Sequence, residues 1–148
     1  MTDKNIPVPE GNSVVSPYLI VESIEKQADF IKKVFGSSLS ESAKQPDGQI
    51  MHAEVNIGNT TIMLGKSNER FPPAPGMMYV YVKNADDVYK KALNNGAVSL
   101  MPPEDRFYGN REGGVKDPQG NTWWIAQFQR KVSPEEIEKG MAEMMKQK

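Results

Sequence analysis

The sequence of 148 residues contains no cysteine and only one histidine. The lack of cysteine excludes disulfide frameworks, thiolate zinc sites, iron–sulfur clusters and a cysteine nucleophile. A single histidine leaves little for a histidine-based metal site or a Ser-His-Asp triad. Most of the familiar catalytic sets are therefore missing.

The net charge is close to zero, and long apolar runs are absent. The chain has 18 Lys and Arg against 19 Asp and Glu, for a formal charge of −1, and no basic stripe of the kind that binds phosphate backbones. No stretch approaches the roughly 18 apolar residues that cross a bilayer, and the first residues show no apolar signal segment. We expect a soluble cytoplasmic protein with neither a nucleic-acid nor a membrane partner.

A repeat is the most informative feature that is present. The segment Gly58-Asn59-Thr60-Thr61-Ile62-Met63-Leu64 recurs as Gly120-Asn121-Thr122-Trp123-Trp124-Ile125-Ala126, and Tyr18-Leu19-Ile20-Val21 recurs as Tyr79-Val80-Tyr81-Val82. A helical pattern follows the earlier segment of each copy. The sequence therefore contains two copies of one supersecondary unit.

The predicted order of elements in each copy is βαβββ. The first copy has a strand over 14–22, a helix between Ser23 and Gly36, and strands over 38–44, 50–57 and 60–65. The second has a strand over 77–83, a helix from Asn84 to near Gly96, a strand from Val98 that Pro102-Pro103 interrupts, and a last hairpin on Asp117-Pro118-Gln119-Gly120. The predicted fold class is α+β, with two tandem βαβββ modules that form curved half-barrels of mixed sheet, and a C-terminal helix.

The same pattern sets the predicted domain boundaries. Residues 1–12 form a flexible arm, and residues 13–130 form one domain, with module one over 13–68, a proline-rich linker over 69–76 and module two over 77–130. Residues 131–148 form the C-terminal helix, because Ser133-Pro134-Glu135-Glu136 is a capping box with proline at the first helical position.

The tandem repeat with its Asp-Pro-x-Gly-x-x-Trp hairpin resembles the vicinal oxygen chelate superfamily, which includes glyoxalase I, bleomycin-resistance proteins and extradiol dioxygenases. The segments 51–54, 105–109 and 117–126 are similar to its phosphonate-operon-associated, PhnB-like branch. The resemblance implies a ligand in the concave groove of each half-barrel and helices on the convex side. It also implies a homodimer.

The resemblance further implies where a metal would be held. Metal-dependent members place four ligands, usually histidine and glutamate, in the first and fourth strands of each module. Those four positions correspond here to Ser16, Met63, Met77 and Trp124. Imidazole and carboxylate are the ligands that such divalent ions prefer, so we expect neither the usual metal centre nor a cofactor. A non-standard site that uses His52 and Glu54 is the alternative, although two ligands alone bind a metal weakly.

Strand alternation predicts which side chains face the groove. The residues that belong against the helices are Leu19, Ile62, Leu64, Val80, Val82, Trp123 and Ile125. The opposite parity gives an aromatic and methionine wall for an unknown small molecule, which consists of Ser16, Tyr18, Met63, Met77, Tyr79, Tyr81 and Trp124. Plain barrel packing explains the same residues equally well.

Two further groups of residues have alternative interpretations. Arg106, Tyr108 and Arg111 are able to clamp an anionic ligand, or the arginines pair with Glu104, Asp105 or Glu112. His52 and Glu54 share a strand face and are the candidate catalytic pair, or they are a structural polar pair. We predict a metal-independent small-molecule-binding protein; the alternative is a lyase- or isomerase-like enzyme that uses His52 and Glu54.

Overall fold

The structure, a computed structural model, describes residues 6–147. It divides into two compact units: the first ends at Gly76 and includes the turn 118–120, and the second holds the remaining residues from Met77 onwards. Residues 1–5 of the predicted N-terminal arm lie outside the described residues. In the rest of the arm, the Gly11 carbonyl accepts a hydrogen bond from Thr61 Oγ1 at 3.0 Å.

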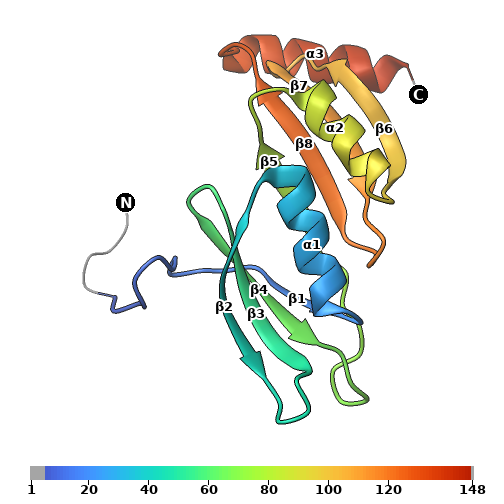
Figure 1. Cartoon of the computed structure of the whole chain (residues 1–148). Coiled ribbons are helices and arrows are strands. Elements are labelled where there is room, and N and C mark those ends of the chain that lie inside the picture. Colours follow the sequence, from blue (N-terminus) through green and yellow to red (C-terminus); the bar gives the residue numbers. More distant parts are fainter. Residues whose placement is uncertain (1–5, 148) are drawn as a thin grey trace. The chain divides into compact units, whose positions relative to one another are not determined.

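The first unit is a βαβββ module (Figure 1). Its elements are β1 (Tyr18–Val21), α1 (Ile24–Phe35), β2 (Ser38–Lys44), β3 (Ile50–Ile57) and β4 (Thr60–Lys66). The strand order is β1-β4-β3-β2. Strand β1 is parallel to β4 and the other neighbours are antiparallel, so the sheet is mixed.

The second unit repeats this topology. Its elements are β5 (Met77–Tyr81), α2 (Ala85–Asn94), β6 (Val98–Asp105), β7 (Asn110–Lys116), β8 (Thr122–Phe128) and α3 (Pro134–Lys146). The order β5-β8-β7-β6, with β5 parallel to β8, matches the first sheet strand for strand. The predicted fold class of two tandem modules with a C-terminal helix is confirmed.

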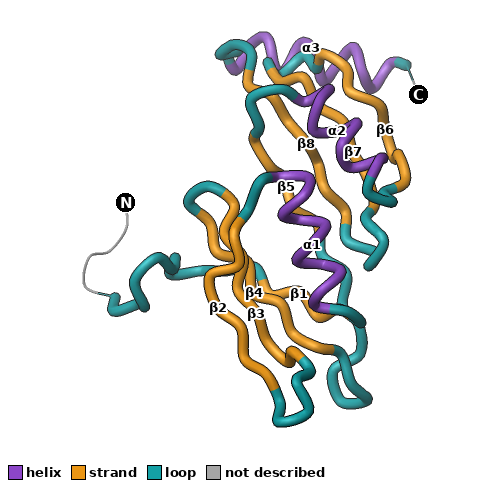
Figure 2. Tube along the Cα trace, in the orientation of Figure 1, coloured by secondary structure: helices purple, strands orange, loops and turns teal. Residues whose placement is uncertain are grey.

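Side-chain caps fix where the helices begin. Ser23, Asn84 and Ser133 each accept a hydrogen bond from the backbone N–H three residues later, which satisfies one of the free donors of a helix N-terminus. Gly36 ends α1 with a φ of 71°, the left-handed conformation that glycine adopts at least cost. The segment between β4 and β5 is loop (Figure 2), as its three prolines favour.

The core of each unit lies between its sheet and its module helix. The side chains predicted to face the helices are buried there, among them Leu19, Ile62, Leu64, Trp123 and Ile125. Trp123 is fully buried, and its indole N–H donates to Asp117 Oδ2 at 2.8 Å. The alternation therefore leaves Tyr18, Met63, Tyr79 and Trp124 on the opposite, concave faces.

Several predicted strand bounds were wrong, and the strand expected over 77–83 ends at Tyr81. The strand expected from Val14 begins only at Tyr18, directly after Pro17. The strand from Val98 is not interrupted at Pro102-Pro103 but continues to Asp105, with a register shift between Met101 and Glu104. Strand β6 is the edge of its sheet, where a shift in register and a missing N–H are tolerated.

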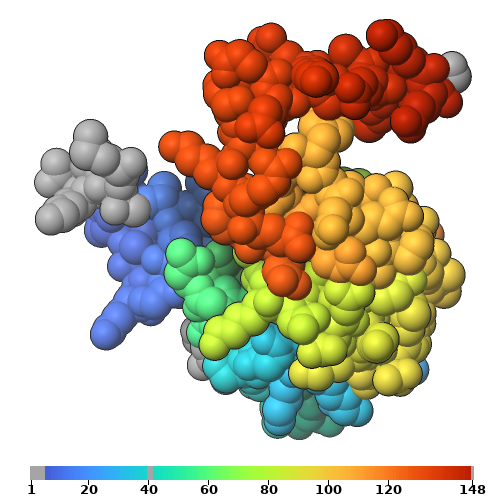
Figure 3. All heavy atoms as spheres, turned by 90° about the horizontal axis from the view of Figure 1, so that it is seen from above, coloured from blue at the N-terminus to red at the C-terminus, as the bar shows by residue number. Residues whose placement is uncertain are grey.

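Helix α3 contacts its own unit sparingly. None of its residues is buried, and in the space-filling view this red end of the chain stands out from the strands of its unit (Figure 3). Its apolar side chains Ile137, Met141, Met144 and Met145 are between 37% and 58% exposed. Across residues 6–147, no helix has the length and apolar character that a membrane span requires.

Candidate functional site

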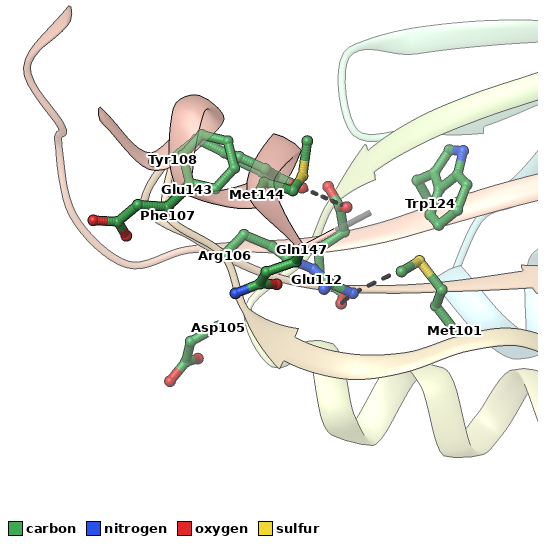
Figure 4. Close-up of a pocket in the computed structure, with 11 residues that line it drawn as sticks. Met101, Asp105, Arg106, Phe107, Tyr108, Glu112, Trp124, Glu143, Met144 and Gln147 are labelled. Carbon is green, nitrogen blue, oxygen red and sulfur yellow. Dashed lines mark hydrogen bonds between the residues drawn. The ribbon is translucent and has the colours of Figure 1, made fainter. Parts of the chain in front are cut away.

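A groove lies between the sheet of the second unit and α3 (Figure 4). Its volume of about 360 Å³ is at the lower end of the range for small-molecule sites. The sheet, the β6–β7 turn and α3 all contribute to its lining, which consists of Met101, Asp105, Arg106, Phe107, Tyr108, Glu112, Trp124, Gly140, Glu143, Met144 and Gln147.

Glu112 is the buried acid of this groove, with 8% of its surface exposed. Its Oε2 accepts a hydrogen bond from the Tyr108 hydroxyl at 2.6 Å, and its Oε1 accepts one from the Tyr79 hydroxyl. The Tyr79 oxygen in turn accepts from Asn110 Nδ2 at 2.9 Å. A chain of hydrogen bonds thus holds the carboxylate in one orientation.

The Tyr79 and Tyr108 hydroxyls stay protonated, and so remain hydrogen-bond donors to Glu112, throughout the ordinary pH range. Burial, followed by the hydrogen bond to Glu112, raises the pKa of Tyr79 to about 12. The same two causes raise the pKa of Tyr108 as well. Both hydroxyls therefore keep their protons and direct them at the Glu112 carboxylate.

Two glycines shape the walls of the groove. A Cβ at Gly114 would overlap the ring of Trp124, so the absence of a side chain there lets the indole lie against β7. A Cβ at Gly140 would overlap the ring of Phe107, which shows where α3 meets the β6–β7 turn. Trp124 remains half-buried and lines the groove.

Arg106 and Arg111 both form ion pairs with acidic side chains. Arg106 pairs with Glu104 at 3.1 Å, and its Nη2 lies 3.4 Å from the Glu112 backbone carbonyl. Arg111 bonds Asp86 at 2.6 Å and Asp105 at 3.1 Å, which lowers the pKa of Asp86 and raises that of Arg111. Arg106 lines the groove and Arg111 does not. Glu104 and Asp105 are two of the three acidic partners expected from the sequence, and Asp86 is an additional one.

The first unit has a smaller polar cluster on its concave face. The Tyr18 hydroxyl lies 3.2 Å from His52 Nδ1, and the ring centroids are 5.7 Å apart. Gly65 makes room for Tyr18, because a Cβ there would come within 2.7 Å of its ring. Glu54, only 7% exposed, accepts from Asn12 Nδ2 at 3.1 Å.

The two clusters occupy equivalent positions in their modules. Tyr18 pairs with Met63 in the first sheet as Tyr79 pairs with Trp124 in the second. His52 lies opposite Gly65, two positions beyond Met63 in β4. Glu112 likewise lies opposite Ala126, two positions beyond Trp124 in β8. Each module therefore joins a first-strand tyrosine to a third-strand ionisable side chain.

The structure brings together only some of the residues predicted from the sequence. Arg106, Tyr108 and Trp124 line the groove, and Tyr79 reaches its acid through a hydrogen bond. Tyr81 is 63% exposed and contacts Tyr79 edge-on, with centroids 5.4 Å apart. In the first unit, Tyr18 and Met63 are partners in the sheet register.

Sequence reasoning missed the acid at the centre of the site. The sequence suggested Glu112 only as an ion-pair partner, although the alternation of β7 places it on the same face as Gly114, which lies opposite Trp124. The contribution of α3 had no sequence signal that tied it to this sheet.

The positions that would hold the superfamily metal do not fit one. Ser16, Met63, Met77 and Trp124 offer a hydroxyl, two thioethers and an indole, which are poor ligands for divalent ions bound by imidazole or carboxylate. In the part of the chain that the structure describes, no three His, Asp or Glu side chains are grouped to hold a metal ion.

Known proteins resemble this chain in sequence. A family described as the glyoxalase/bleomycin resistance protein/dioxygenase superfamily matches residues 12–125. An uncharacterized protein of Mycobacterium bovis is 32% identical over 139 residues, covering 86% of this chain and 91% of the relative. An uncharacterized protein of Mycobacterium tuberculosis has the same identity, with 82% of the relative covered.

Solved structures share the fold. TioX from Micromonospora sp. ML1 aligns with a TM-score of 0.67 and 22% identity, over 78% of this chain and 98% of that one. A PhnB protein from Bacillus cereus aligns with a TM-score of 0.65 and 20% identity, over 78% and 99% of the two chains. The chain belongs to the glyoxalase/bleomycin resistance protein/dioxygenase superfamily.

Proposed function

We propose that this chain is a small-molecule-binding protein that works without a metal ion and holds its ligand in the groove between the second sheet and α3. The observation that carries the proposal is the groove itself, which combines aromatic walls with an oriented carboxylate. A few fixed polar groups in a mostly apolar cleft are typical of small-molecule sites. The poor donor set at the four superfamily metal positions supports metal independence.

A thermal-unfolding screen with a chemically diverse compound library tests this function. A compound that binds only the folded protein raises the melting temperature by mass action. Trp124→Leu removes a groove wall, whereas Phe128→Leu changes an exposed aromatic residue on the same strand that does not line the groove. We expect stabilising compounds to lose their effect on W124L and to keep it on F128L. Equal stabilisation of both variants by every hit would contradict the proposal.

Metal independence needs a separate measurement. Hits from the screen are titrated against protein treated with a chelator and against protein incubated with nickel, cobalt or zinc. We expect the same affinities in all samples and no stoichiometric metal after gel filtration. Metal retained at one ion per chain, with tighter ligand binding, would refute metal independence and leave the groove assignment standing.

The Tyr18–His52 contact favours a second candidate, a lyase- or isomerase-like enzyme that uses His52 and Glu54. A histidine beside a tyrosine hydroxyl is able to transfer a proton to or from a ligand. The test is turnover: a substrate found by screening would be converted by the wild type and not by His52→Ala, while both bind it. Conversion at wild-type rate by H52A would exclude this role.

A homodimer and a cytoplasmic location are further proposals. The exposed tyrosines and Met77 on the concave faces provide apolar area that a second copy would cover. Light scattering that finds only monomer at high concentration would contradict the dimer.

A further inference from the structure

We propose that the groove of the second unit binds organic cations, with the Glu112 carboxylate as the group that receives an ammonium or amidinium and the aromatic side chains as walls for an aromatic or aliphatic body. This inference rests on the proposed function, since it names the class of ligand for the same groove.

The hydrogen bonds of Glu112 leave room for a ligand. An ionised carboxylate has about four acceptor positions, and the two tyrosine hydroxyls take one on each oxygen. Both hydroxyls are neutral, so they orient the Glu112 carboxylate without cancelling its charge. Because a buried charge is costly unless it is paired, a cation that reaches Glu112 gains the interaction that the tyrosines cannot supply.

The groove lining carries a net negative charge. Three acidic side chains, Asp105, Glu112 and Glu143, line the groove against one basic side chain, Arg106, for a formal charge of −2. Arg106 is paired with Glu104 and Asp105 is paired with Arg111, so each of these two lining charges is compensated by a neighbour, and Glu112 and Glu143 supply the net negative charge. A cleft lined mainly by one sign of charge attracts ligands of the opposite sign.

The walls suit the body of such a ligand. Trp124, Tyr108 and Phe107 present aromatic rings, and Met101 and Met144 present adaptable thioethers. Aromatic faces attract organic cations through the ring quadrupole, and tryptophan is the strongest of them. The groove therefore combines the two features that recognise an amine attached to an apolar body.

A charge series on one scaffold tests the inference. The probes are 2-phenylethylamine, 2-phenylethanol and phenylacetate, titrated into isotope-labelled protein while the two indole N–H signals are followed by NMR. Trp124 lines the groove, whereas Trp123 is fully buried and bonded to Asp117, so the Trp123 signal reports folding. We expect the amine to bind about tenfold more tightly than the alcohol, since bonds to charged groups exceed neutral ones. The acid should bind most weakly.

Two variants with the same change of charge locate the effect. Glu112→Gln should abolish the preference for the amine, and Glu138→Gln, on an exposed face of α3 outside the lining, should preserve it. Alcohol or acid binding as tightly as the amine to the wild type would overturn the cation inference alone, even if E112Q does not fold. If no probe moves the Trp124 signal, the groove assignment fails with it.

Discussion

Removing the Tyr79 hydroxyl tests how the site holds its acid. Tyr79→Phe deletes the bond to Glu112 Oε1 and leaves Asn110, 7% exposed, without its Tyr79 acceptor. Hydrogen bonds to charged groups contribute about 1.5–3 kcal/mol. Since Tyr79 is 46% exposed, water replaces part of that loss. We expect Y79F to lower the free energy of unfolding by about 1–2 kcal/mol, measured by urea denaturation followed by circular dichroism.

A double-mutant cycle separates the charge from the hydroxyl. With Glu112→Gln in place the bond becomes neutral, and Y79F should then cost only about 0.5–1 kcal/mol. Tyr81→Phe is the control: this residue is 63% exposed, and the change should cost under about 0.5 kcal/mol. An equal cost of Y79F in the wild-type and E112Q backgrounds would refute the claim that an ionised Glu112 is held by this hydroxyl.

Three other changes have defined outcomes. The pKa of Tyr79 is about 12 in the folded protein and about 10 for an ordinary tyrosine. Its contribution to the free energy of unfolding is therefore complete below pH 10 and is lost as the pH rises toward 12. Unfolding measured as a function of pH should show this alkaline loss of stability in the wild type and a smaller loss in Y79F. Gly114→Ala should displace the Trp124 ring, cost about 1–3 kcal/mol and shift the indole fluorescence, and an unchanged spectrum would contradict the contact. Asp117→Ala should cost at least about 2 kcal/mol by calorimetry, because it leaves the buried Trp123 N–H without its carboxylate, and a neutral effect would argue against that bond.

Much of the fold was predictable because its signals are local. Period-two alternation located the strands and separated helix-facing from concave side chains, and Ser23, Asn84 and Ser133 located the helix starts. The repeat then gave the topology. The error at Pro102-Pro103 arose because a proline is excluded from a central strand and tolerated at an edge, and the sequence does not say which strand is the edge.

The site was less predictable because its contacts depend on sheet register and helix docking. The groove-facing side of β8 could be assigned from parity, and Trp124 lines the groove as that parity predicts. The role of Glu112 could not be predicted from the sequence, because its tyrosine partners come from β5 and from the β6–β7 turn, and no single window of sequence contains all three residues. The wall from α3 depends on the contact of Phe107 with Gly140, which has no local signature.

The most direct test of the groove assignment is a crystal structure of the protein with its tightest-binding probe. We expect the probe to lie between the second sheet and α3, against Trp124 and within hydrogen-bonding distance of Glu112. A probe bound instead on the first unit, beside Tyr18 and His52, with this groove filled only by water, would contradict it.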